Sequence, residues 1–222
     1  MTVNFDILYD CENFAVINKN AGIAVQQWTN VPYEKSLECK LKNYFHQKNE
    51  KVFLVHRLDK DTSGCLIIAK NLSAKEIFEK MFREGDVKKE YLTLVKGIVK
   101  NKKGTIKIPL QGRGNSLVNA LTFYEVKKTF SKENISLVKV KIKTGRKHQI
   151  RQHFAKMHHP VVMDKIYGDF KFNKNFEKTY KLHRQFLHAQ NISFDFKDKK
   201  YNFTAPLPID IGKIINGATS RI

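Results

Sequence analysis

The sequence is poor in cysteine, with three residues, Cys11, Cys39 and Cys65, that stand far apart in a chain of 222 residues. An odd count without a CxxC pair indicates neither a disulfide framework nor a four-cysteine zinc site. Free thiols suit a reducing compartment. The first residues also lack the basic and apolar segments of a secretory signal. We therefore expect a cytoplasmic protein.

Long apolar runs are missing as well. No stretch of the sequence approaches the ~18 residues that a membrane helix needs, and neither a Pro/Gly/Ser-rich linker nor an internal repeat divides the chain. Hydrophobic residues make up 41% and charged residues 28%, close to the globular average, which excludes a disordered or collagen-like chain. We expect one folded domain over residues 1–222 and no membrane association.

Acidic residues are scarce, with 21 Asp and Glu against 41 Lys and Arg, for a net charge of +20. This excess attracts polyanions, and nucleic acid is the obvious partner. Most of the basic residues are lysine, which can also reflect surface composition alone. Arginine is more informative because Arg57, Arg146 and Arg151 lie in the two most unusual stretches of the chain, where a planar guanidinium could bind phosphate or carboxylate.

Runs rich in Val, Ile, Phe and Tyr predict that strands dominate. The clearest is 138–143, where Val138, Val140 and Ile142 alternate with lysines, as in a strand with one buried and one basic, solvated face. A hairpin is predicted at 191–196 and 201–204 around a charged turn. The other predicted strands cover residues 5–8, 14–18, 52–58, 65–69, 91–99 and 121–126.

Two helices stand out from the strands. The first covers Leu72–Glu84, with a capping-box pattern of Ser73 and Glu76 at its start and Gly85 at its end. The second covers 147–158. Runs of strands with helices inserted between some of them predict an α+β domain with a mixed, mostly antiparallel sheet flanked by helices.

The polar segment 55–70, VHRLDKDTSGCLIIAK, lies between two apolar strands. Asp59 follows His56 and Arg57 and precedes Lys60, and these cations favour an ionised carboxylate that acts as nucleophile or electrostatic stabiliser. The same pattern fits equally well a turn aspartate that is paired with Arg57. Asp61, before Thr-Ser-Gly, is more typical of a turn residue.

This segment resembles the catalytic block of the RluA family of pseudouridine synthases, which reads HRLD, two residues, TSG and an apolar strand. Asn20 stands where Pro is usual in the family, Cys65 where an aliphatic residue is usual, and Met163 where many members have Gly. The resemblance spans roughly residues 3–208, and further blocks follow in family order: NKNAG at 18–22, KEYLTLVKG at 89–97, TGRKHQIR at 144–151, HP at 159–160, DKIYG at 164–168, LHA at 187–189 and AP at 205–206.

The resemblance implies an isomerase that breaks the N1–C1′ bond of a uridine in RNA, turns the uracil and rejoins it through C5, without a cofactor or a metal. Asp59 would be the required carboxylate, attacking the sugar or the base or assisting departure of the uracil. Tyr91 would stack on the uracil and help to move a proton near C5. Arg151 would pair with Asp59, and Ile150 would pack against the base.

The target nucleotide must leave its stack to reach such a carboxylate. Arg57 is expected to fill the vacated space, because its flat guanidinium can stack on bases. The start of the second helix is expected to hold phosphates. The histidines at 148, 153, 158 and 159 do not share one helical face, which disfavours zinc. The complete set of RNA-binding candidates is His56, Arg57, Thr62, Arg146, Lys147, His148 and Ile150.

The blocks look most like the branch that acts on large-subunit ribosomal RNA, without its S4-type RNA-binding domain. We therefore expect 23S ribosomal RNA as the substrate and a monomer as the working form. Two alternatives stay open: a transfer RNA synthase of the same family, and a non-catalytic RNA-binding or ribosome-assembly module. A glycosidase would need a second positioned carboxylate, for which only Asp61 is available in these blocks.

Overall fold

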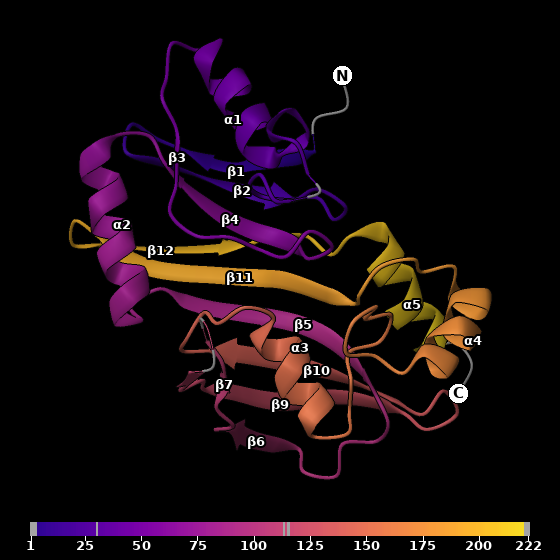
Figure 1. The fold of residues 1–222 in the computed structure, drawn as a ribbon. Helices are drawn as coiled ribbons and strands as arrows, with labels where there is room; N and C mark the ends of the chain where they lie inside the picture. Colours follow the sequence, from indigo (N-terminus) through magenta and orange to yellow (C-terminus); the bar gives the residue numbers. More distant parts are fainter. Residues whose placement is uncertain (1–3, 30, 113, 115, 220–222) are drawn as a thin grey trace. The chain divides into compact units, whose positions relative to one another are not determined.

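The computed structural model describes residues 4–29, 31–112, 114 and 116–219. The chain forms two compact units. Unit 1 comprises Met1–Val87 and Ala189–Pro206, and unit 2 comprises Lys88–His188 and Leu207–Ile222. Each unit is described by itself below, with the element labels of Figure 1.

Unit 1 is built on antiparallel strands that follow one another as β1 (Phe5–Asp10), β2 (Phe14–Lys19) and β4 (Ser63–Ala69). The short strand β3 (Phe53–Leu54) also pairs with β4. Residues 189–196 of β11 (Leu187–Phe196) lie beside β4, and β12 (Lys199–Thr204) pairs with β11. The helices of the unit are η1 (Tyr33–Lys35), α1 (Leu37–His46) and α2 (Leu72–Glu84).

The core of unit 1 is strongly aromatic. Phe14 on β2, Phe78 on α2 and Phe194 on β11 are almost fully buried, and their ring centroids lie 5.2–5.4 Å apart in edge-to-face contacts. Such contacts stabilise a core beyond the area that they bury. They attach α2 to the sheet from which the segment between β3 and β4 extends.

Unit 2 contains antiparallel strands in the order β5 (Lys88–Lys96), β10 (Ile135–Ile142), β9 (Thr122–Phe130) and β6 (Lys103–Ile106). A separate pair is formed by β7 (Leu110–Gln111) and β8 (Leu117–Val118). Helix α3 (Gln149–Lys156) covers one face of the larger sheet, and Phe176 of α4 (Phe170–Tyr180) and Ile211 of α5 (Ile209–Thr219) join the core on the other face. The expected α+β class, with a mixed and mostly antiparallel sheet flanked by helices, is confirmed.

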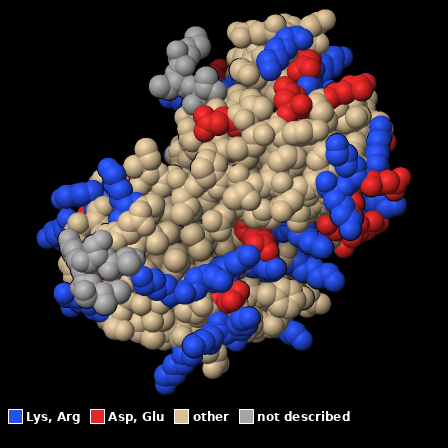
Figure 2. Space-filling model, turned by 180° about the vertical axis from the view of Figure 1, so that it is seen from behind, with Lys and Arg blue, Asp and Glu red and all other residues tan. Residues whose placement is uncertain are grey.

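The predicted strand around residue 140 is confirmed, and its two faces differ as expected. Val138 and Val140 are fully buried, whereas Lys141 is exposed and its Nζ lies 2.7 Å from Glu90 Oε1. Lys139 contacts the same carboxylate. Figure 2 shows Lys and Arg side chains interspersed with acidic ones. Glu90 therefore neutralises part of the basic face.

Two details of the predicted elements are wrong. Strand β3 contains only two of the residues 52–58, because the following residues form a loop that is held by tertiary contacts. Helix α2 has the predicted bounds and ends at Gly85, with φ +85, but Asn71 is its N-cap and accepts a hydrogen bond from Ala74 N at 2.8 Å. The Ser73 and Glu76 pattern is therefore not the cap.

In the part of the chain that the structure describes, no helix is long and apolar enough to cross a membrane.

Candidate active site

Asp59 lies in the loop between β3 and β4 of unit 1, and it is half-buried. Residues 59–62 form a turn, because the backbone N–H of Thr62 donates to Asp59 O at 3.1 Å. Leu58 is buried beneath the loop, while Arg57 and Lys60 are exposed. The loop therefore has an apolar anchor and presents cationic side chains to solvent on either side of Asp59.

A buried lysine fixes this loop from below. Lys19, the last residue of β2, is fully buried, and its Nζ donates to the carbonyl oxygens of Asn20 (2.9 Å), Lys60 (3.0 Å) and Thr62 (2.8 Å). A buried charge is stable only when hydrogen bonds replace its hydration, and three carbonyls match the three N–H bonds of an ammonium. Two of these carbonyls belong to the loop, so the charge of Lys19 holds the backbone next to Asp59.

Lys19 was given no role from sequence, although it stands in the matched NKNAG block. The signal that the sequence offers is the apolar run FAVI just before it, which is typical of a buried strand; in the structure all six residues of β2, FAVINK, are buried. A lysine in such a strand needs polar partners, but the sequence does not show which carbonyls provide them. Asn20, where Pro is usual, offers its backbone carbonyl, which Pro also possesses.

His56 anchors the other end of the loop. Ile67 N on β4 donates to His56 Nε2 at 2.8 Å, and the imidazole stacks on Phe82 of α2 with ring centroids 4.4 Å apart. Since Nε2 accepts a hydrogen bond, the proton of the neutral ring sits on Nδ1. These contacts give His56 a positioning role, and its contact with RNA stays a prediction.

The backbone conformation and surroundings of Gly64 explain why the TSG sequence has glycine at this position. Its φ is +114, a conformation that other residues rarely adopt, and a Cβ at this position would lie 2.2 Å from Ala189 O. Ala189 closes the LHA block, so two distant blocks are in contact within unit 1. Thr62 and Ser63, on either side of the loop's end, are buried. Thr62 contributes backbone atoms to the loop, and its predicted RNA contact is untested.

In unit 2, Tyr91 lies on β5 and is 7% exposed. It pairs with Val140 of β10, which pairs in turn with Tyr124 of β9, so the three side chains share one sheet face. Helix α3 covers that face, since Phe154 contacts Tyr124 with centroids 5.8 Å apart. Ile150 of the same helix is buried, as a residue that packs against an apolar surface must be.

Arg151 on α3 forms a buried, two-point ion pair with Asp164. Its Nε lies 2.7 Å from Oδ2 and its Nη2 lies 2.9 Å from Oδ1. Burial would raise the pKa of Asp164, but hydrogen bonds from Arg151 and from the backbone N–H groups of Tyr167 and Ile166 outweigh it, so the pKa is lowered. Asp164 therefore stays ionised and orients the guanidinium.

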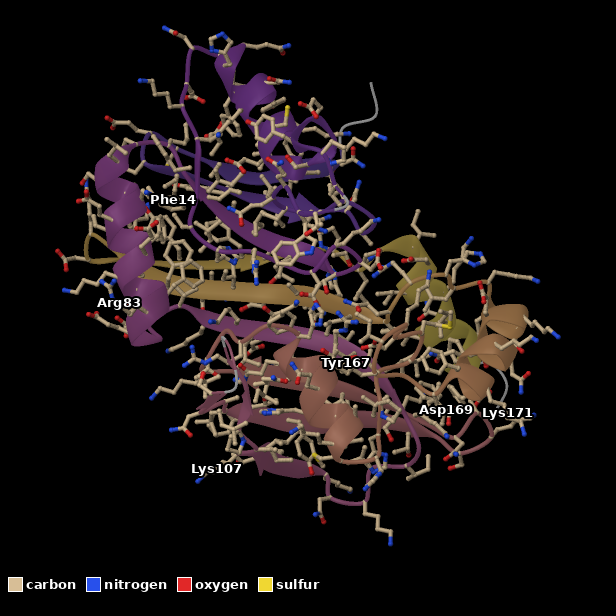
Figure 3. The ribbon with its side chains drawn as sticks, viewed as in Figure 1. Phe14, Arg83, Lys107, Tyr167, Asp169 and Lys171 are labelled. Atoms are coloured by element: carbon tan, nitrogen blue, oxygen red, sulfur yellow. The ribbon has the colours of Figure 1, made fainter. Side chains whose placement is uncertain are left out.

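Asp164 is a second residue that the sequence reasoning left without a role, although it begins the matched DKIYG block. The residue before it, Met163, has φ +64 in the left-handed region, where many family members carry Gly. Figure 3 shows Tyr167 in the segment between α3 and α4, and the Arg151 guanidinium lies 5.3 Å from the centroid of its ring. The expected pairing of Arg151 with Asp59 is untested.

The segment before α3 differs in part from expectation. Arg146 and Lys147 are exposed, as phosphate-binding residues should be. The backbone N–H of Arg146 is not free, however, because it donates to Gln149 Oε1 at 3.1 Å. His148 has φ +53, and its Nδ1 lies 3.2 Å from Tyr167 Oη. Contact with phosphate would therefore come from side chains rather than from that amide.

The remaining histidines have protein partners. His153 Nδ1 lies 2.9 Å from Thr122 Oγ1 and its Nε2 lies 2.9 Å from Ile108 O, while His159 Nδ1 lies 2.9 Å from Lys96 O. Burial lowers the pKa of His153. Over the described ranges no three His, Cys, Asp or Glu side chains are grouped as a metal site requires.

Comparison with known proteins assigns the class. Residues 13–156 match the family model described as RNA pseudouridylate synthase. Among solved structures, Human RNA Pseudouridylate Synthase Domain Containing 4 superimposes with a TM-score of 0.79 at 23% identity, over 96% of this chain and 92% of that one. At this identity the superposition shows the fold alone, which is the pseudouridine synthase fold.

Two curated relatives carry the assignment further. The chain is 32% identical to Ribosomal large subunit pseudouridine synthase C of Buchnera aphidicola subsp. Baizongia pistaciae, over 92% of its own length and 67% of that protein. It is also 32% identical to tRNA pseudouridine synthase C of Haemophilus ducreyi, over 86% of both. The chain belongs to the RNA pseudouridylate synthase family, its resemblance to the RluA group is confirmed, and it is an isomerase that acts on RNA.

Proposed function

We propose that this pseudouridine synthase modifies uridines of large-subunit ribosomal RNA, 23S in bacteria, with Asp59 as its catalytic carboxylate. The observation that carries the proposal is the position of Asp59, in a loop whose backbone is bound by the buried Lys19 ammonium. A carboxylate that must meet one carbon or one ring atom of the substrate needs such a fixed backbone. The name of the Buchnera relative supports the choice of ribosomal RNA.

The proposed reaction conserves composition. The N1–C1′ bond of the uridine breaks, the C5–C1′ bond forms, C5 loses its proton and N1 gains one. Asp59 takes part by attack on the sugar or the base, or by assisting departure of the uracil. Tyr91 stacks on the uracil and helps to remove the C5 proton, and Ile150 packs against the base. Arg151 pairs with Asp59 while Asp164 orients its guanidinium.

The proposal includes extrusion of the target nucleotide. Arg57 is exposed beside Asp59, and we assign its planar guanidinium to the space that the flipped base leaves, where it stacks on neighbouring bases. Arg146, Lys147 and His148 supply cationic and hydrogen-bonding contacts for the RNA backbone. Contacts of this kind place the RNA without reading its sequence.

We also propose that residues 1–222 act as one catalytic domain, as a monomer, in the cytoplasm and without a cofactor. The family match supports the first point because it extends over both units. The three free cysteines suit a reducing compartment.

The direct test of the substrate is a map of pseudouridines in total RNA from cells with and without this gene. We expect one or more sites in large-subunit ribosomal RNA to disappear in the deletion strain and to return with the wild-type gene. Loss of sites only in transfer RNA would favour the second candidate, which the name of the Haemophilus relative supports. An unchanged map would contradict the proposal.

A further inference from the structure

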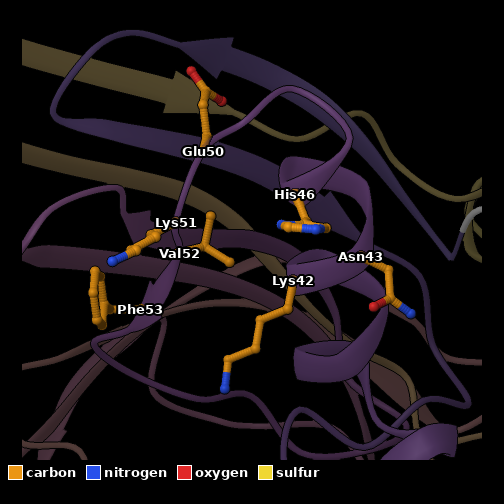
Figure 4. Close-up of a pocket in the computed structure, with 7 residues that line it drawn as sticks. All are labelled: Lys42, Asn43, His46, Glu50, Lys51, Val52 and Phe53. Atoms are coloured by element: carbon orange, nitrogen blue, oxygen red, sulfur yellow. The ribbon is translucent and has the colours of Figure 1, made fainter.

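A pocket lined by none of the residues that we assign to the reaction lies on unit 1, between α1 and the segment that leads into β3. Its volume is about 330 Å³, at the small end of the range for small-molecule sites. In Figure 4, Val52 lies in the middle, with Lys51 and Phe53 to one side of it and side chains of α1 to the other. The residues that line it are Lys42, Asn43, His46, Glu50, Lys51, Val52 and Phe53.

The floor and the rim of the pocket differ in chemistry. Val52 is 7% exposed and Phe53 is half-buried against the aromatic core, so both form an apolar base. Asn43, His46 and Lys51 are exposed at the rim. An aromatic and aliphatic floor beneath an amide and cationic groups suits a planar base attached to a phosphate.

The charges of the pocket favour an anion. The one carboxylate in its lining, Glu50, is engaged through Oε1 by Lys70, whose Nζ lies 2.6 Å away, whereas its Oε2 is buried without a hydrogen-bond partner among the described residues. Lys42 contacts Glu38 one turn earlier at 2.8 Å, but its side chain is 47% exposed and can move toward a phosphate. Lys51 adds a further basic side chain, and His46 adds ring nitrogens that can form hydrogen bonds.

The position of the pocket relates it to the substrate. Phe53 precedes Asp59 by six residues, so the two lie at most about 20 Å apart even if the intervening chain is fully extended. RNA that presents its target uridine to Asp59 carries neighbouring nucleotides over such distances. The pocket is therefore within reach of a nucleotide a few positions from the target.

We propose that this pocket binds a single unpaired nucleotide of the substrate RNA, outside the target uridine. Its base packs on Val52 and Phe53, the Asn43 amide bonds to the edge of the base, and Lys42, His46 and Lys51 contact the adjoining phosphates. The inference deepens the proposed function, on which its choice of RNA rests. Its consequence is selection of RNA in which a loop or bulge lies near the modified uridine.

The test compares two charge-matched double variants of the full chain. The pocket variant is Lys42→Glu with Lys51→Glu. The control is Lys75→Glu with Lys200→Glu, which changes the same charge on the same unit. Lys75 matches Lys42 because it also faces a glutamate one helical turn away, Glu79, at 3.5 Å. Two quantities are measured for each variant. The first is its affinity for an RNA hairpin that contains the target uridine, by fluorescence anisotropy at fixed salt. The second is its thermal midpoint of unfolding.

We expect the pocket variant to bind the hairpin at least tenfold more weakly than the control, with equal thermal midpoints. Wild-type protein and hairpins that carry 4-thiouridine at single positions near the target should yield crosslinks to the peptide containing residues 42–53. Equal affinity of the two variants, or crosslinks only to other peptides, would overturn the inference. Asn43→Ala, which alters no charge, should weaken binding in the same direction.

These outcomes separate the pocket from the proposed function. Affinity and crosslinking do not require turnover. Wild-type protein that forms pseudouridine while both variants bind equally would retain the function and reject the pocket. Wild-type protein that crosslinks through residues 42–53 but forms no pseudouridine in ribosomal RNA would retain the pocket and reject the proposed target.

Discussion

Among single residues, Lys19 supports the Asp59 loop from outside it, through its buried charge. Its ammonium binds the carbonyls of Lys60 and Thr62. Loss of a charged donor leaves these acceptors without compensation for their lost hydration. The loop would then move, and Asp59 would move with it.

Lys19→Met retains the apolar stem and removes the charge. We expect it to lower the free energy of unfolding by about 2–4 kcal/mol and to lower kcat, with little change in KM because the exposed cations remain. Urea unfolding and single-turnover kinetics measure the two effects. The matched control is Lys70→Met, since the Lys70 side chain is 6% exposed and its partners, Asp10 and Glu50, lie outside the loop. An equal loss of kcat in the control would exclude a positioning role for Lys19.

The ion pair of Arg151 and Asp164 predicts a dependence of stability on pH. Because the folded-state pKa of Asp164 lies below its ordinary value of 3.8, this carboxylate stabilises the fold fully above about pH 4. Its contribution is lost as the pH falls through the lowered pKa. Asp164→Asn should cost about 3–5 kcal/mol near neutral pH, since a buried guanidinium loses its partner, and its stability should fall less steeply in acid. Parallel pH profiles for wild type and variant would contradict this account.

Sequence reasoning at this scale identified Asp59, Tyr91 and Arg151 as candidates through a resemblance, and it left out the residues that support them. Asp164 is separated from Arg151 by 13 positions, and Lys19 from Thr62 by 43. Neither pairing has a local pattern, because each forms only when distant segments meet. A buried lysine or aspartate is visible in a sequence only when its burial is already known.

Among the elements, β4 and β11 meet at a sterically constrained junction. Gly64→Ala would place a Cβ against Ala189 O in a backbone conformation that alanine avoids. We expect a loss of about 3 kcal/mol or more in the free energy of unfolding. By contrast, Gly212→Ala in α5 should raise the free energy of unfolding by about 0.5–1 kcal/mol, because alanine favours a helix over glycine. A Cβ at this position meets no atom within 4 Å. Thermal unfolding measures both, and a tolerated Gly64→Ala would show that the contact can relax.

Periodicity predicted some elements well and missed others for a physical reason. The bounds of α2 and the two faces of β10 follow from clear apolar spacing. Helix α4, FKFNKNFEKTY, is rich in residues of modest helix propensity, and it is stabilised by the Asp169 cap and by burial of Phe176. The stretch 52–58 reads as a strand because it begins with the apolar run Val-Phe-Leu-Val, but contacts of His56 and Lys19 fix the residues after β3 in a loop.

For the whole molecule, the net charge of +20 overstates the charge available to RNA. Burial raises the pKa of Glu90, but its bonds to Lys139 and Lys141 outweigh this and lower it, so the three groups carry about one net charge. Replacing Glu90, Lys139 and Lys141 together with Gln removes about one net charge, so it should reduce the slope of log affinity against log salt by about one. A reduction near two would mean that Glu90 does not neutralise the two lysines.

Replacing Arg57 with Gln should have a different effect. It should lower the rate of pseudouridine formation by a larger factor than it lowers the affinity for RNA.

The central claim is that Asp59 performs the chemistry, and release of tritium from RNA labelled at uracil C5 tests it most directly. Asp59→Asn should lower the rate of release by at least about a thousandfold without changing the thermal midpoint or the affinity for RNA. Asp61→Asn, two residues further along the same loop, is the matched control and should keep most of the wild-type rate. Tritium release by Asp59→Asn at a rate close to that of wild type would contradict the account.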